Sequence, residues 1–138
     1  MEYPRQYLYL RIVRAKLFID ERYSSAIDLT NIAGEACFSK YHFFRVFRSI
    51  YGLTPHQYLT HVRIEKAKEL LADGSPVAAV CYAVGFDSIT SFTGLFKRRT
   101  GLTPARYQLA ENERRRRMVH QAAAFVPNCF ASEQGWKE

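Results

Sequence analysis

The chain repeats itself with a period of 49 residues, and this internal repeat limits the folds it can adopt more than any other feature. The tetrapeptide Gly-Leu-Thr-Pro occurs at 52–55 and again at 101–104. Positions before and after it match in the same register, so the two copies are related units. The shared positions are Ser39, Phe43, Phe47, Gly52, Leu53, Thr54, Pro55 and Tyr58 in the first copy and Ser88, Phe92, Phe96, Gly101, Leu102, Thr103, Pro104 and Tyr107 in the second.

The spacing of apolar residues predicts helices along the chain, and the repeated tetrapeptides fall between them. Leu8, Ile12, Ala15 and Ile19 recur at three- and four-residue intervals, which is typical of a helix with one buried face. Glycine ends helices readily because it tolerates a positive φ, and proline begins them because its φ is already helical. The Gly-Leu-Thr-Pro segments are therefore interpreted as turns between helices.

These helices predict an all-α fold of two helix-turn-helix units joined by a long linker helix, about seven helices in total. Asp28 and Ser39 are expected to cap helices of the first unit, and Ser75 caps a short helix in the second unit with Pro76 at its first position. Gly85 suits the turn that follows. The expected organisation is 1–54 for an N-terminal helix and the first unit, 55–73 for the linker helix, 74–108 for the second unit and the start of a final helix, and 109–138 for a C-terminal extension.

Each unit ends in a longer helix, at about 39–51 and 88–100, with a core face and an outward face. The side chains expected to face the core are Phe43, Val46, Phe47 and Ile50 in the first helix and Phe92, Leu95 and Phe96 in the second. The side chains expected to face outward are Tyr41, Phe44, Arg45 and Arg48 in the first and Thr90, Thr93, Gly94 and Lys97 in the second.

The charge distribution favours an anionic partner. The net charge is +7 with a pI of about 9.5, and residues 1–108 hold 15 Lys/Arg against 9 Asp/Glu. The segments 39–51 and 88–100 contain six Lys/Arg and no acidic residue. A basic helix face in a helix-turn-helix unit is typical of DNA binding, although a solvated basic face without a ligand is the alternative.

The segment "AVGFDSITSFTGLFKRRTGLTPARY" at 83–107 resembles the signature of the AraC/XylS family of bacterial transcription regulators, and the resemblance extends from about Leu8 to Gln108. It implies seven helices, with two helix-turn-helix units and one linker helix. In the family the outward residues of each longer helix, the recognition helix, read DNA bases. These positions correspond here to Tyr41, Phe44 and Arg45 and to Ile89, Thr90, Thr93 and Gly94.

The chemistry of these residues agrees with such roles. Arg45 is expected to bind guanine O6 and N7, and Tyr41 and Phe44 to touch thymine methyl groups. Phe44 and Gly94 depart from the polar or basic residues that the family often has there, so the second helix is expected to contribute backbone and methyl contacts more than base hydrogen bonds. The expected phosphate contacts are Ser39, Lys40, Arg48, Ser88, Lys97 and Arg98, with help from the amides at the helix starts.

The function expected is a sequence-specific transcription regulator, an activator that binds double-stranded DNA as a monomer and has RNA polymerase as a further partner. A monomer is expected because the two recognition helices differ. The alternatives are an architectural DNA-binding protein with little base preference and a cysteine-based redox sensor. The ratio of specific to nonspecific DNA affinity distinguishes a sequence-specific regulator from an architectural protein. The accessibility of the thiols in the native state distinguishes it from a redox sensor.

Other chemistry is not indicated. Cys37, Cys81 and Cys129 form neither a metal-ligand spacing nor a disulfide framework, and buried apolar filler is the simplest interpretation. The four histidines likewise lack a spacing for metal binding or catalysis. We therefore expect no enzyme activity, catalytic residue, metal or cofactor. Without a signal peptide or membrane-spanning run, the expected location is the cytoplasm.

Three further features leave alternatives open. Arg63 in the linker helix is expected to brace the two units, in preference to a phosphate contact. The run Arg114–Arg117 is a solvated face or an additional phosphate attachment. Phe125, Val126, Phe130 and Trp136 pack back on the domain or form a partner surface. With no effector domain before the first helix, the chain is expected to be a stand-alone family member or a part of a longer protein.

Overall fold

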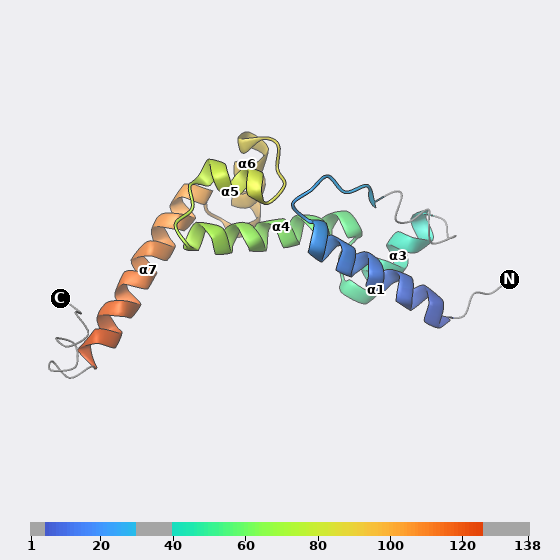
Figure 1. Ribbon diagram of the computed structural model, residues 1–138, viewed down its shortest axis with the longest axis horizontal. Helices are drawn as coiled ribbons and strands as arrows, with labels where there is room; N and C mark the ends of the chain where they lie inside the picture. The colour runs from blue at the N-terminus through green and yellow to red at the C-terminus, as the bar shows by residue number, and fades with distance from the viewer. Residues whose placement is uncertain (1–4, 30–39, 126–138) are drawn as a thin grey trace.

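The computed structural model describes residues 5–29 and 40–125, and every regular element in these ranges is an α-helix (Figure 1). The expected all-α fold is confirmed, with six helices in the described part of the chain. Of the short helix expected after Asp28, the structure describes Leu29, which is helical and buried. The rest of that helix and the capping role of Ser39 lie outside the described residues. The helices are α1 (Arg5–Arg22), α3 (Lys40–Tyr51), α4 (Pro55–Ala72), α5 (Val77–Ala83), α6 (Ile89–Thr100) and α7 (Pro104–Ala124).

The linker helix predicted over 55–73 is confirmed as α4, which is continuous from Pro55 to Ala72. Its start is fixed by a capping box, in which Thr54 Oγ1 accepts from the Gln57 amide at 3.3 Å and Gln57 Oε1 accepts from the Thr54 amide at 3.0 Å. Its end is fixed by Gly74, whose φ is +92°. Eighteen residues at 1.5 Å each make a rod of about 27 Å that runs between the two units (Figure 1).

Two separate cores lie along this rod. The first packs α1 and α3 on the beginning of α4, and the second packs α5, α6 and α7 on the rest of it. Linker residues Ile64, Ala67 and Leu71 are buried in the second core, and Leu59 is buried in the first. The fully buried aromatic residues are Phe43 and Phe47 in the first core and Phe92 and Phe96 in the second. The repeat of the sequence is therefore a repeat of the core.

Both Gly-Leu-Thr-Pro segments form the turn that the sequence predicts. Gly52 and Gly101 have φ of +77° and +84°, and each donates its amide to the last turn of the preceding helix. The threonine of each segment is the N-cap of the next helix, and the proline is its first residue. The two turns are therefore equivalent in geometry as well as in sequence.

The predicted start of α5 is wrong by one residue. Pro76 occupies the N-cap position in an extended conformation, with ψ of 143°, and no side chain caps the helix. Ser75 is not the cap, because the helix begins at Val77 and Ser75 lies one residue before the N-cap position. Its backbone instead completes the end of α4: the Ser75 amide donates to Leu70 O at 3.1 Å, and the Ser75 carbonyl accepts from Gln108 Nε2 at 2.7 Å.

The final helix is longer than the repeat requires. α7 begins in the second unit, then leaves the body of the molecule and projects into solvent (Figure 1). The expected division at 108/109 thus falls inside one continuous helix of 21 residues. Phe125 is 90% exposed and does not pack back on the domain, whereas Val126, Phe130 and Trp136 lie outside the described residues. None of the described helices is long and apolar enough to cross a membrane.

Arg63 connects the two units, as expected. Its Nε donates to the carbonyl of Tyr23 at 2.7 Å, and its Nη2 donates to the carbonyl of Ser25 at 3.1 Å. Its guanidinium carbon also lies 5.8 Å from the ring centre of Phe86 in the second unit. The linker helix therefore touches the segment after α1 and the α5–α6 turn through one side chain.

Candidate nucleic-acid interface

α3 presents cations and an aromatic side chain on its outer surface. Tyr41 is 79% exposed, and Lys40, Arg45 and Arg48 are exposed as well. The helix is held in place from beneath by Phe43 and Phe47, which are fully buried. The outer side chains therefore project from an element that a packed core fixes in orientation.

The predicted division of α3 into two faces holds for most positions but not for Phe44 and Ile50. Phe44, expected to be outward, is half-buried, with ring-centre distances of 6.1 Å to Phe43 and 6.0 Å to His56. It lies at the edge of the core because the start of α4 covers it. Ile50, expected to be inward, is 40% exposed at the last turn of the helix.

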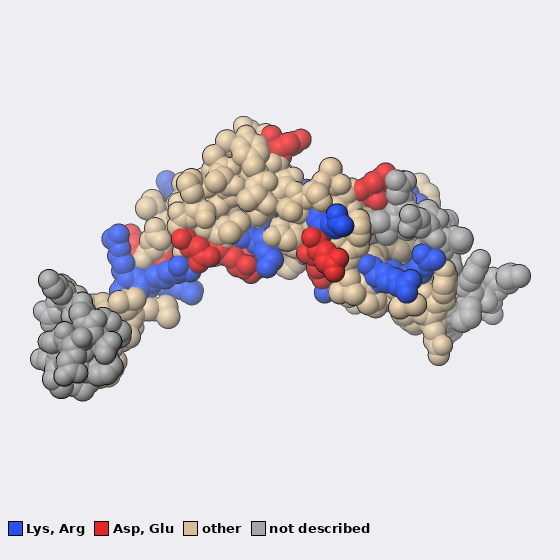
Figure 2. All heavy atoms as spheres, viewed as in Figure 1, with Lys and Arg blue, Asp and Glu red and all other residues tan. Residues whose placement is uncertain are grey.

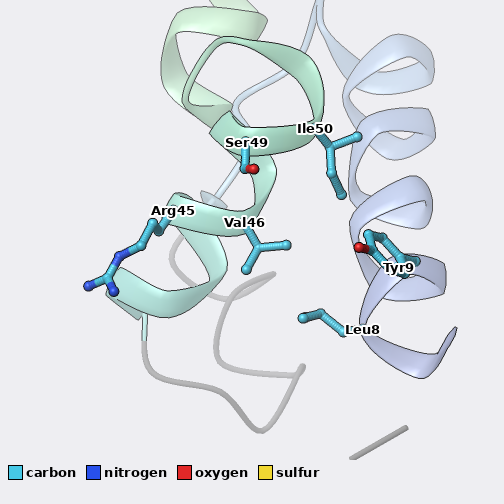
Figure 3. A pocket seen from close by; sticks show the side chains of 6 residues that line it. All are labelled: Leu8, Tyr9, Arg45, Val46, Ser49 and Ile50. Carbon is cyan, nitrogen blue, oxygen red and sulfur yellow. The ribbon is translucent and has the colours of Figure 1, made fainter. Parts of the chain in front are cut away.

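Ile50 instead lines a shallow pocket of about 310 Å³ between α1 and α3, together with Leu8, Tyr9, Val46, Ser49 and Arg45. In Figure 3 the side chains of Val46 and Ile50 point toward α1, whereas the guanidinium of Arg45 points away from it. Arg45 therefore belongs to the outer surface of α3, and only its stem contributes to the pocket.

α6 presents a smaller and more polar outer surface. Thr90 and Gly94 are exposed, Ile89 is 41% exposed, and Thr93 is half-buried. A Cβ added at Gly94 would meet no atom within 4 Å, so the middle of this helix faces open space. Phe92 and Phe96 are buried beneath it, as predicted, and Leu95 is half-buried.

The start of α6 is capped by a residue expected to contact phosphate. Ser88 Oγ accepts from the amide of Ser91 at 3.3 Å, which fixes the first turn. The remaining amides of that turn give the helix start a partial positive charge, which favours anions. At the other end, Lys97 and Arg98 are exposed, and so is Arg99, which the sequence interpretation did not assign a role. The run of three cations at 97–99 is the sequence feature that indicates a role for Arg99 beside Lys97 and Arg98.

The cations of the recognition helices have no acidic partner within the described residues. No ion pair in these ranges involves Arg45, Arg48, Lys97, Arg98 or Arg99. On α4, by contrast, Lys66 pairs with Glu69 at 3.3 Å and Lys68 with Glu65 at 2.8 Å. The exposed cations of the recognition helices are therefore free to meet an external anion.

The charge is mixed on other parts of the surface. Figure 2 shows acidic and basic side chains side by side along the middle of the molecule and a basic group where α7 leaves the body. On α7, Arg114, Arg115 and Arg117 lie 3.8, 3.4 and 3.7 Å from Glu111, Asp73 and Glu113. Most of this arginine run is therefore a solvated, partly neutralised face.

Of the three cysteines, the structure describes Cys81. Cys81 is fully buried, and burial raises the pKa of its thiol, an effect to which the charge of Asp87 adds. A buried thiol with a raised pKa reacts slowly. Cys37 and Cys129 lie outside the described residues, and the described residues contain no cluster of three or more His, Cys, Asp and Glu that is placed to hold a metal ion.

The known proteins that this chain resembles are transcription regulators with helix-turn-helix domains. A helix-turn-helix domain family matches residues 32–110, which is more than half of the chain. The probable transcriptional regulator LumQ of Photobacterium leiognathi is 33% identical over 72% of this chain, and the match covers 40% of LumQ. The transcriptional activator AarP of Providencia stuartii is 33% identical over 69% of this chain and 71% of its own length.

A solved structure shows the same arrangement of helices. The DNA-binding domain of the global transcriptional factor AdpA, crystallised with a target DNA, has a TM-score of 0.70 and 31% identity, over 75% of this chain and 95% of that domain. The chain spans less than half the length of LumQ. With the family match, the two relatives and the AdpA domain in agreement, the chain belongs to the AraC family of helix-turn-helix transcription regulators and has the fold of their DNA-binding domain.

Proposed function

We propose that this protein is a sequence-specific DNA-binding transcription regulator that inserts α3 and α6 into successive segments of the major groove. One observation carries the proposal: two equivalent helices, each supported by its own core, expose cations that no acidic side chain of the described residues neutralises. A recognition helix in a helix-turn-helix unit meets DNA through such a surface.

The side chains divide into base readers and phosphate contacts. Arg45 reads guanine through O6 and N7, and Tyr41 contacts thymine methyl groups. Phe44 reaches a base only with its exposed edge, because half of it is buried. On α6 the base readers are Ile89, Thr90, Thr93 and Gly94. The phosphate contacts are Ser39, Lys40, Arg48, Ser88, Lys97 and Arg98, to which the exposure of Arg99 adds a further candidate.

The relatives support a regulatory role. The AdpA domain was crystallised on a target DNA, LumQ is named as a probable transcriptional regulator, and AarP is named as a transcriptional activator. We infer that this chain also activates transcription in the cytoplasm, with RNA polymerase as its protein partner. It binds as a monomer, because unlike faces on α3 and α6 require an asymmetric site that one copy fills.

The test is selection of binding sites from random duplex DNA, followed by affinity measurements at one fixed salt concentration. A specific regulator is expected to bind its selected site about 10³-fold or more tighter than random duplex. The affinity should also fall with salt, with a slope of about −0.9 for each phosphate contact. A ratio near one would instead establish an architectural protein, and no binding at all would leave a solvated basic face.

A further inference from the structure

The two units meet at a junction built around Arg63, halfway along α4. On one side its guanidinium donates to the carbonyls of Tyr23 and Ser25, which follow α1. On the other side it lies against the ring of Phe86, which packs in the second core. The segments in contact are separated by about 20 to 60 residues in the sequence. Arg63 therefore connects the segment after α1 with the turn between α5 and α6, in addition to the connection that α4 makes between the two units.

The junction has no spare room. Gly85, in the turn between α5 and α6, has φ of +98°, and a Cβ added there would lie 2.8 Å from Tyr23 O and 3.0 Å from Arg63 Nε. A distance of 2.8 Å to a backbone oxygen is shorter than a carbon can tolerate without a shift. The backbone of the second unit's turn therefore packs directly on the backbone that ends the first unit's helix.

Packing around the junction also spans both units. The ring of Tyr23 packs against both hydrophobic cores. Burial lowers the pKa of Arg63, and the charge of Asp87 acts in the opposite direction. A partly buried guanidinium is stabilised when its donors find acceptors, and the two carbonyls accept from two of its five N–H groups. Lysine has no planar fork with which to reach both carbonyls.

We propose that this junction, with Arg63 as its positioning residue, fixes the angle between the two recognition helices and thereby sets the spacing of the DNA half-sites that the protein accepts. A half-site is the DNA segment under one recognition helix. This inference rests on the proposed function. One base pair added between half-sites moves the second by about 3.4 Å and rotates it by about 35°, so a rigid junction cannot follow it.

The experiment uses the full chain and its selected DNA site, with the spacing between half-sites changed by −2, −1, +1 and +2 base pairs. The variants are Arg63→Met, which keeps the stem and loses the donors, and Arg63→Lys, which keeps the charge. Lys66→Met is the matched control, because it removes a cation of the same helix that pairs with Glu69. Circular dichroism establishes that each variant is folded.

Wild type and Lys66→Met are expected to lose about tenfold or more in affinity at ±1 base pair, comparable with a lost base contact. For Arg63→Met the loss should shrink to less than about threefold, because the units then adjust independently. Arg63→Lys should fall between the two. Binding to each isolated half-site should stay within about twofold of wild type, since neither recognition helix is altered.

Gly85→Ala opens the same junction from the other side and should broaden the spacing preference even though Arg63 is intact. Unchanged spacing preference in folded Arg63→Met and Gly85→Ala would overturn the inference and assign the geometry to α4 alone. If Arg63→Met does not fold, Arg63→Lys and Gly85→Ala decide. A wild-type protein with no preferred site would sink the proposed function instead, so the two failures are distinguishable.

Discussion

The two helix-turn-helix units share a framework and differ in the surface that the framework supports. Phe47 and Tyr58 pack edge to face with ring centres 5.9 Å apart in the first unit, and their equivalents Phe96 and Tyr107 do the same at 5.4 Å in the second. Above these matched cores, α3 exposes Arg45 where α6 exposes Gly94. The conformation of a unit therefore depends on residues that recur every 49 positions, and its DNA preference depends on residues that do not.

The two units also differ in what holds them to α4. In the first, the Tyr58 hydroxyl donates to Asp20 Oδ1 at 2.6 Å, and Asp20 pairs with Lys16 at 2.7 Å, which ties α1 to α4. In the second, Gln108 of α7 donates to Leu71 O at 3.0 Å and so satisfies a carbonyl at the end of α4. The tyrosine is repeated, but its polar partner is not.

The largest effect tests whether the cores are equivalent. Phe47→Ala and Phe96→Ala should each lower the free energy of unfolding by about 3–5 kcal/mol, because each removes a fully buried ring. Urea denaturation of both variants measures this loss. Values that differ by more than about 2 kcal/mol would show that one core relaxes around the cavity and the other does not.

Next in size is the contribution of one base reader. Arg45→Ala should lower specific affinity by about 1–3 kcal/mol and relax the preference at one base pair, the usual cost of a lost bidentate contact. Arg48→Ala should instead weaken binding to specific and random duplex by similar factors. Titration of both variants against both DNAs separates the roles. A uniform loss for Arg45→Ala would make it a phosphate contact.

The asymmetry of the two surfaces predicts an asymmetric DNA site. Substitutions of single base pairs under α3 should cost about 1–3 kcal/mol at the contacted positions, and those under α6 should cost less than about 1 kcal/mol. A scan of the selected site at fixed salt gives the values. Equal or greater penalties under α6 would identify Thr90, Thr93 or DNA shape as stronger readers than the side-chain chemistry indicates.

Most of the helix boundaries and core positions could be predicted from the sequence, because residues close together in the chain determine them. Gly52, Thr54 and Pro55 define a helix end, a cap and a helix start by themselves, and their recurrence at 101–104 doubles the signal. The core positions Phe43 and Phe92 follow from helical spacing in the same way. Helix ends, caps and core positions of this kind depend on residues that are close to one another in the sequence.

The predictions that were wrong concern residues whose burial depends on contacts with other helices. Phe44 is half-buried because His56 of another helix covers it, and Ile50 is 40% exposed because it lines the open pocket between α1 and α3. Helical periodicity places a residue on a face but not relative to a second helix. The contacts of Arg63 required three segments to meet, so the sequence indicated the brace but not the carbonyls that accept from it.

A smaller effect separates the two repeated tyrosines. Tyr58→Phe should lower the free energy of unfolding by about 1 kcal/mol through loss of the bond to Asp20, whereas Tyr107→Phe should cost less, because its hydroxyl makes no hydrogen bond among the described residues. Burial, followed by the Asp20 hydrogen bond, raises the pKa of Tyr58 above its ordinary value of 10.0.

The sign of the pH dependence follows from that shift. The folded state favours the protonated hydroxyl of Tyr58, so its contribution is complete below pH 10 and is lost as the pH rises through the folded pKa. Unfolding measured between pH 8 and pH 11 should show a steeper alkaline decline for wild type than for Tyr58→Phe. Parallel curves would mean that the hydroxyl carries no linkage to folding.

The smallest effect concerns Gly94, where the second unit departs most from the first. Gly94 lies in the interior of α6 with open space around it, and glycine is about 0.5–1 kcal/mol less favourable than alanine or arginine in a helix. Gly94→Ala and Gly94→Arg should therefore both raise the free energy of unfolding by about that amount, as measured in urea. Only the arginine adds a cation to the proposed DNA surface.

Comparison of the two variants on DNA shows what the glycine is for. Gly94→Ala should leave affinity within about twofold of wild type, whereas Gly94→Arg should strengthen binding and steepen the salt slope by about 0.9 if the new cation reaches a phosphate. A preference for guanine in the half-site under α6 would show that it reaches a base instead. If alanine alone abolishes binding at that half-site, the α6 backbone must approach DNA more closely than a methyl group permits, and the absence of a side chain at Gly94 is then itself the means of docking.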